Sequence, residues 1–144
     1  MTVMFGFIEC FNSDDEKVFN FNKKVLDQLP TFGACICKDM FAMLPIHNKA
    51  LCYPTSTIIH FVLEDRNEYF FMPQRKNEFE SLLTKLCWTS AMLIETYSGN
   101  RYEWRADASY HNKLLPIKNW SFTVFESHHY LKEIEYGDEG PIDS

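Results

Sequence analysis

The clearest pattern of apolar and polar positions lies between residues 57 and 105. β-Branched and aromatic residues dominate 57–63, polar residues interrupt the pattern at 64–67, and apolar residues return at 69–72, which predicts two strands joined by a turn. Beyond this point, apolar residues recur with the spacing of one helix face: Phe79, Leu82, Leu83, Leu86 and Cys87. The sequence therefore predicts an amphipathic helix that packs against the preceding sheet.

The chain after Cys87 has two interpretations. The helical spacing could continue to a C-cap at Gly99, or the helix could end near Cys87 and a hairpin of 91–97 and 100–106 could follow. We favour the hairpin, because 101–105 alternates charged and aromatic residues, as a strand with one solvated face does.

The N-terminal part predicts a strand followed by a helix. Both alternating sets of residues in 2–9 are mostly apolar, so we expect a strand covered on both of its faces. Ser13 and Glu16 have the spacing of a capping box, and Pro30 cannot continue a helix, which together predict a helix over 14–29. The expected buried side of this helix carries Val18, Phe21, Val25 and Leu29.

The remaining segments add strands and set the fold class. The mixed apolar run 33–46 predicts a strand, or a strand followed by a short turn, and further strands are expected at 120–125 and 128–136. We predict an α+β fold, with a single mostly antiparallel sheet and two main helices packed on one face. Residues 1–136 would form one domain, and 137–144 an acidic flexible tail.

Composition and charge narrow the classes of partner that the protein is expected to bind. The chain has 144 residues, of which 46% are hydrophobic, enough for one packed core. Its formal charge is −6, and residues 132–144 contain five acidic residues and one lysine. This balance disfavours nucleic acid and anionic membranes and favours a basic partner. No apolar run approaches the ~18 residues of a membrane span, and the five cysteines form no Cys-x-x-Cys pair, so we expect a cytoplasmic protein with buried free thiols.

No pattern of catalytic, metal-binding or nucleotide-binding residues emerges. The possible metal ligands lack the spacing of a four-ligand site: Cys35, Cys37, Asp107, His111, Glu126, His128 and His129. Asp107, Ser109 and His111 would lie in a line along one strand, which is not the arrangement of a catalytic triad. His60 is expected to be an ordinary histidine of the sheet, and the glycines form no phosphate-binding loop. We therefore expect neither a cofactor nor a metal.

Elimination leaves a non-catalytic binding module. In its size, its acidity and its tail Glu133-Ile-Glu135-Tyr136-Gly-Asp138-Glu139, the chain resembles, at the level of a class, the immunity proteins with which bacteria neutralise toxins of neighbouring cells. The resemblance implies a tight complex with a basic, often nuclease-type, toxin domain.

The expected partner-binding residues lie in an acidic turn and in the tail: Glu64, Asp65, Glu68, Glu133, Glu135, Tyr136, Asp138 and Glu139. Two other classes stay open. One is a small-molecule-binding or enzymatic α+β domain, with a pocket between sheet and helices lined by Phe, Trp and a histidine. The other is a structural or regulatory subunit.

Overall fold

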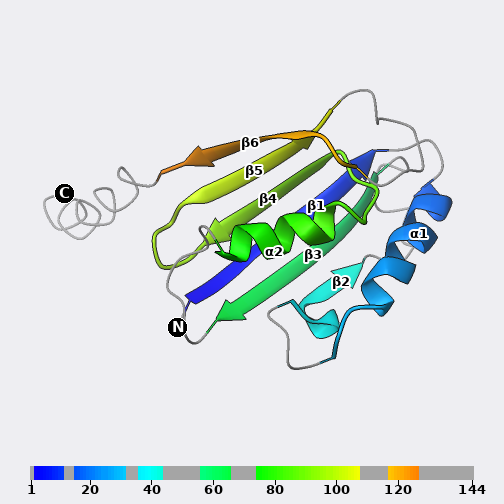
Figure 1. Ribbon diagram of the computed structural model, residues 1–144, viewed down its shortest axis with the longest axis horizontal. Helices are drawn as coiled ribbons and strands as arrows, with labels where there is room; N and C mark the ends of the chain where they lie inside the picture. The colour runs from blue at the N-terminus through cyan, green and yellow to red at the C-terminus, as the bar shows by residue number, and fades with distance from the viewer. Residues whose placement is uncertain are drawn as a thin grey trace, which may run out of the picture.

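The computed structural model describes residues 2–11, 15–31, 36–43, 56–65, 74–107 and 117–126. Within them, one antiparallel sheet has the strand order β2-β3-β1-β4-β5-β6 (Figure 1). The strands are β1 (Thr2–Phe11), β2 (Phe41–Met43), β3 (Ser56–Asp65), β4 (Ser90–Glu95), β5 (Arg101–Ala106) and β6 (Trp120–Phe125). The helices are α1 (Asp15–Asp27), the 3-10 turn η1 (Lys38–Met40) and α2 (Gln74–Leu83). The predicted α+β class with an antiparallel sheet is confirmed.

Both helices pack on the same face of the sheet. Leu26 of α1 and Phe79 and Leu83 of α2 belong to one buried cluster with the strand residues that point toward the helices. In Figure 1, α2 lies across the middle of the sheet and α1 lies at the β2 end. The predicted stripe from Phe79 to Cys87 is buried throughout. We call this side of the sheet the covered face.

The strand β1 lies at the centre of the sheet and demands glycine at one position. It pairs with β3 along its whole length and with β4 over residues 4–9. A Cβ placed on Gly6 would lie 1.8 Å from the carbonyl oxygen of Met92, so any side chain here would push β1 and β4 apart.

The hairpin predicted after Cys87 is confirmed, and the alternative of a helix that continues to Gly99 is wrong. The helix α2 ends at Leu83, whose carbonyl accepts a hydrogen bond of 2.9 Å from the indole Nε1 of Trp88. The chain then turns into β4, and Gly99 has the positive φ of 77° that the β4–β5 turn requires. Its N–H donates to the carbonyl of Glu95, 2.7 Å away.

A buried carboxylate forms hydrogen bonds with residues of this turn and of the strand that follows it. Glu95 is fully buried, and its Oε1 accepts hydrogen bonds from the hydroxyl groups of Ser98 and Tyr102. Burial raises the pKa of Tyr102, and the charge of Glu95 raises it further, whereas a hydrogen bond with Asn100 acts in the opposite direction. Glu95 thus organises the turn on the covered face.

The N-terminal helix contacts the sheet through a polar residue as well as apolar ones. Val18 and Leu26 are buried, and so is Asn22, whose side chain forms two hydrogen bonds, of 2.8 and 2.9 Å, with the backbone of Cys87. The expected buried set omitted Asn22 and Leu26. The predicted capping residue Ser13 lies outside the described residues.

The remaining predictions of turns and strands agree with the structure only in part. The turn was expected to start at Glu64, but β3 continues through Asp65. Glu64 pairs with Val3 of β1, and Asp65 pairs with Thr2. The segment 33–46 contributes η1 and the short strand β2, and the strand at 120–125 is confirmed as β6. The strands expected at 69–72 and 128–136 lie outside the described residues. None of the helices that the structure describes is long and apolar enough to cross a membrane.

Candidate binding surface

The face of the sheet opposite the helices carries a contiguous apolar area on its three middle strands. Strand register aligns Val62, Phe5 and Ile94 in one row across β3, β1 and β4. The neighbouring row consists of His60, Phe7 and Met92. We define the open-face patch as Phe5, Phe7, Ile58, Val62, Met92 and Ile94. Phe5 is 42% and Val62 53% exposed.

This patch corrects the prediction that β1 is covered on both faces. The helices cover only the side of Met4 and Ile8, while Phe5 on the other side is exposed. The apolar residues of that side lie beside one another, since Phe5 is opposite Val62 on one flank and Ile94 on the other. The apolar residues on the two sides of β1 therefore have different surroundings: one side is buried under the helices, and the other forms an apolar surface.

The patch is hollowed. A depression of about 410 Å³ lies over β1, and its lining includes Phe5, Phe7, Ile58 and Met92. Gly6 also belongs to this lining. A second depression of about 690 Å³ shares Phe5, Gly6 and His60 with the first and continues past the β3 edge toward η1. Together they form a continuous concave apolar surface.

His60 lies where the two depressions meet, and it is exposed. It is opposite Phe7 on one flank and Ala42 on the other. Among the residues that the structure describes, it is the only histidine. Its position gives the open-face patch one polar group able to accept or donate a hydrogen bond at its centre.

Charged residues surround the patch unevenly. Glu9 and Glu64 lie on the same face, at opposite ends of the apolar rows. Asp39 of η1 lines the second depression together with Glu64. The neighbouring strand β5 presents Arg101 and Glu103, which form an ion pair of 3.9 Å. Carboxylates thus flank the apolar half of the face, and mixed charges occupy the β5 side.

The predicted partner-binding residues fall in different places. Glu64 is exposed at the margin of the open-face patch. Asp65 is the last residue of β3. The others lie outside the described residues: Glu68, Glu133, Glu135, Tyr136, Asp138 and Glu139. The apolar residues of the patch were not among the predicted site residues, although apolar side chains on both faces of 2–9 and 57–63 were a signal for them.

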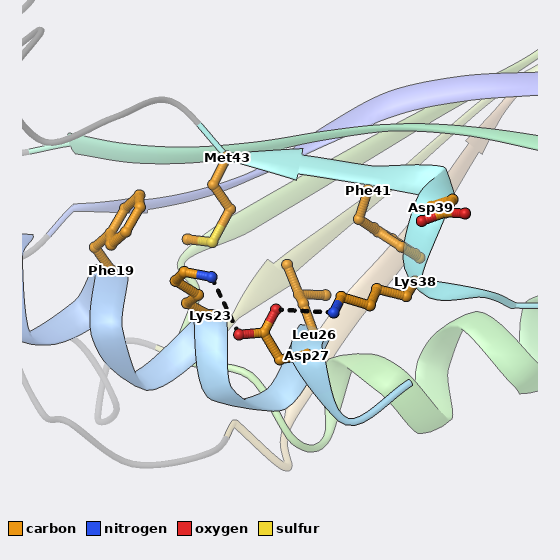
Figure 2. A pocket seen from close by; sticks show the side chains of 8 residues that line it. All are labelled: Phe19, Lys23, Leu26, Asp27, Lys38, Asp39, Phe41 and Met43. Carbon is orange, nitrogen blue, oxygen red and sulfur yellow. Dashed lines mark hydrogen bonds and ion pairs between the residues drawn. The ribbon is translucent and has the colours of Figure 1, made fainter. Parts of the chain in front are cut away.

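A third hollow, of about 350 Å³, lies between α1 and β2 (Figure 2). Phe19, Leu26, Phe41 and Met43 form its apolar lining. Figure 2 shows Asp27 between two lysines: its carboxylate lies 3.1 Å from Lys23 Nζ and 3.7 Å from Lys38 Nζ.

These contacts neutralise the charged side of the hollow. The hydrogen bond from Lys23, helped by the charges of both lysines, lowers the pKa of Asp27. The lysines therefore already have an anion, and a ligand anion would have to compete with it. Among the described residues that line this hollow there is neither tryptophan nor histidine, so this part of the lining differs from the pocket expected for a small-molecule domain.

Two buried thiols form a pair that sequence reasoning missed. Sγ of Cys10, at the end of β1, lies 3.8 Å from Sγ of Cys87, which follows α2. The hydrogen bond with Cys87 and burial raise the pKa of Cys10, so the thiol keeps its proton and is a poor nucleophile. The expectation of buried free thiols is confirmed for the three cysteines that the structure describes, Cys10, Cys37 and Cys87.

Within the described residues, no group of three His, Cys, Asp or Glu side chains could hold a metal ion. Of the possible ligands weighed from sequence, Cys37, Asp107 and Glu126 are described. The geometry thus gives greater weight to the open-face patch than to any cluster of reactive groups.

Comparison with known proteins assigns no family: no family model matches the chain, and neither a curated protein nor a solved structure shows significant similarity to it.

Proposed function

We propose that the protein is a non-catalytic binding protein that holds a basic protein partner against the open-face patch. The observation that carries the proposal is the exposure of Phe5 and Val62 within a continuous apolar area. Contiguous exposed apolar areas on soluble domains commonly mark interaction sites. The large apolar side chains in such areas supply most of the binding energy when a partner excludes water from them.

Charge favours a basic partner. Carboxylates of Glu9, Asp39 and Glu64 flank the patch or its depressions, and the whole chain carries −6. Acidic groups around an apolar centre would speed the encounter with a basic surface, and the apolar centre would then slow dissociation. The proposed contact area is therefore apolar at its middle and acidic at its margin.

The finer proposal is an immunity protein that blocks a cognate bacterial toxin domain of nuclease type in the cytoplasm. It rests on the resemblance in size, acidity and tail composition. In this proposal, Glu64 belongs to the acidic margin, and the further partner contacts are Asp65, Glu68 and the carboxylates and Tyr136 of 133–139. A protein of this class neutralises its partner by binding it tightly, so it needs no catalytic group of its own.

The test is affinity capture from the native host with the tagged full-length protein, followed by mass spectrometry and by binding measurements on the purified partner. Val62→Lys places a cation at the centre of the patch, and Tyr97→Lys is the control, because Tyr97 is an exposed large apolar residue outside the patch. We expect Val62→Lys to weaken binding at least tenfold through faster dissociation. Equal binding by the Val62→Lys variant would contradict the proposed surface.

The acidic margin has its own test. We expect the Glu9→Gln/Glu64→Gln variant to associate several-fold more slowly at low salt and to lose part of its salt dependence. The Glu133→Gln/Glu135→Gln/Asp138→Asn/Glu139→Gln variant examines the tail separately. Unchanged association at low salt in both variants would argue against a basic partner. Turnover or tight binding of a small molecule by the purified protein would instead favour the enzymatic or ligand-binding alternative.

A further inference from the structure

Among the described strands, β6 forms one edge of the sheet, and its own six residues include none of the charges or prolines that protect edges. It pairs with β5, its one neighbour in the sheet that the structure describes. All six of its residues are uncharged, and it contains neither proline nor glycine. Edges of this kind are templates for pairing with another strand, and natural proteins usually interrupt them with charges, prolines or bulges.

Both sides of β6 are apolar and exposed near its end. Val124, on the side of the helices, is 38% exposed, and Phe125, on the open side, is 42% exposed. The opposite edge of the described sheet differs, because β2 has only three residues. A short edge offers few hydrogen bonds to a partner, so β6 is the better edge for association.

We propose that β6 pairs in antiparallel fashion with β6 of a second copy of this chain, around a two-fold axis perpendicular to the sheet. Paired residues in a continuous sheet share a face, so one residue must lie on the axis, and the strand pairs over most of its length only if this is residue 122 or residue 123. With Phe122 on the axis, Trp120 of each copy is opposite Val124 of the other. An aromatic residue opposite a β-branched one is a favourable cross-strand pair.

The charged residues beside β6 favour the register with Phe122 on the axis over the register with Thr123 on the axis. Continued beyond the strand ends, the register with Phe122 on the axis places Lys118 opposite Glu126 of the other copy. Both residues are exposed. The register with Thr123 on the axis would place Glu126 opposite Trp120 and would form no charge pair. Two-fold symmetry repeats each contact, so the dimer gains two aromatic–valine pairs and two ion pairs.

The two-fold axis also orients the open-face patches. Because the axis is perpendicular to the sheet, both copies keep their open faces on the same side of the joined sheet. The dimer would therefore present two patches toward one side. A six-residue edge buries less area than the ~1,200–2,000 Å² of a stable complex, so we expect a weak, concentration-dependent dimer. The inference does not depend on the proposed function.

The experiment is sedimentation equilibrium of the full chain over a wide concentration range, with a charge exchange to test the register. Lys118→Glu and Glu126→Lys each place like charges opposite one another twice, so each should weaken dimerisation about fivefold to tenfold. The Lys118→Glu/Glu126→Lys variant restores opposite charges and should dimerise like the original chain. Circular dichroism confirms folding of each variant.

A second pair of variants locates the dimer contact. Val124→Lys should abolish dimerisation, and Val62→Lys on the open face should leave it unchanged. A monomer at every concentration would overturn the proposal. So would a dimer that Val62→Lys disrupts and Val124→Lys does not, or single charge reversals that the double variant fails to rescue.

Discussion

The covered and open faces of the sheet are built from the same strands with similar residues, but they serve different ends. On the covered face, the rings of Phe61, Phe79 and Trp104 pack in a row, with centroids 5.1 and 4.9 Å apart. On the open face, Phe5 and Val62 keep about half of their surface in solvent. Strand alternation decides which residues share a face, but the helices decide which face becomes the core. An apolar face without a helix is the feature that needs a functional explanation.

The largest expected effect concerns the covered face and is a difference in reaction rate of its buried thiols between the native and the unfolded protein. Cys10 and Cys87 are buried, and a protonated buried thiol reacts only when the protein opens. We expect these two thiols to react with an alkylating reagent at least about a thousandfold more slowly in the native than in the unfolded protein. Isotope-coded alkylation with peptide mapping measures each cysteine separately. Rapid native labelling of either thiol would show that the covered face is loosely packed.

Two neighbouring residues of β4 test the difference between the covered and the open face through the free energy of unfolding. Leu93 is fully buried on the covered face, and Ile94 belongs to the open-face patch. We expect Leu93→Ala to lower the free energy of unfolding by about 3 kcal/mol and Ile94→Ala by about 1 kcal/mol, because only the first leaves a cavity in the core. Urea denaturation gives both values. Equal losses would mean that another layer covers the open face in solution.

Gly6 tests how closely β1 and β4 pack at the centre of the sheet, between the two faces. We expect Gly6→Ala to cost about 2–3 kcal/mol, because the new Cβ would collide with the carbonyl of Met92 rather than with a movable side chain. Thermal denaturation measures the loss, and Ala42→Gly on β2 is a control for a small change at an exposed strand position. A fully stable Gly6→Ala variant would show that β1 and β4 can separate at little cost.

The turn at Gly99 joins the apolar strand β4 of the open face to the charged strand β5. A β-branched residue resists positive φ, so Gly99→Val should cost on the order of 1 kcal/mol or more. Amide hydrogen exchange should show alternating protection across 90–106 in the original chain. Continuous protection of the helical kind through Tyr97 would contradict the hairpin.

The smallest effect is expected at the most exposed position of the open-face patch. Val62 is 53% exposed, so Val62→Thr should change the free energy of unfolding by less than about 0.5 kcal/mol. The same variant should still weaken binding of the proposed partner, because the hydroxyl would be buried in the complex. A clear loss of stability would indicate that the patch contributes to folding rather than to binding.

The sequence predicted best those features that depend on local spacing. The stripe from Phe79 to Cys87 and the hairpin at Gly99 follow from residues a few positions apart. Features that depend on distant partners escaped prediction. The strand β3 continues through Glu64 because Val3 pairs with it, and Cys10 meets Cys87 across 77 positions.

The candidate surface was missed for a related reason. The apolar character of Phe5 and Phe7 was evident, but a pattern of alternation is the same whether the second face is covered or not. Only the placement of both helices on one side distinguishes the two cases. Of the acidic residues that the prediction emphasised, Glu64 lies at the margin of this surface rather than at its centre.

The central position of β1 has a consequence for the order in which the chain is made and folded. This strand leaves the ribosome before its partners β3 and β4, which begin only at Ser56 and Ser90. Contacts between such distant segments slow folding, whereas the local β4–β5 hairpin can form early. During synthesis, a strand that is apolar on both sides therefore lacks its neighbours for an interval, and in that interval it is exposed to aggregation.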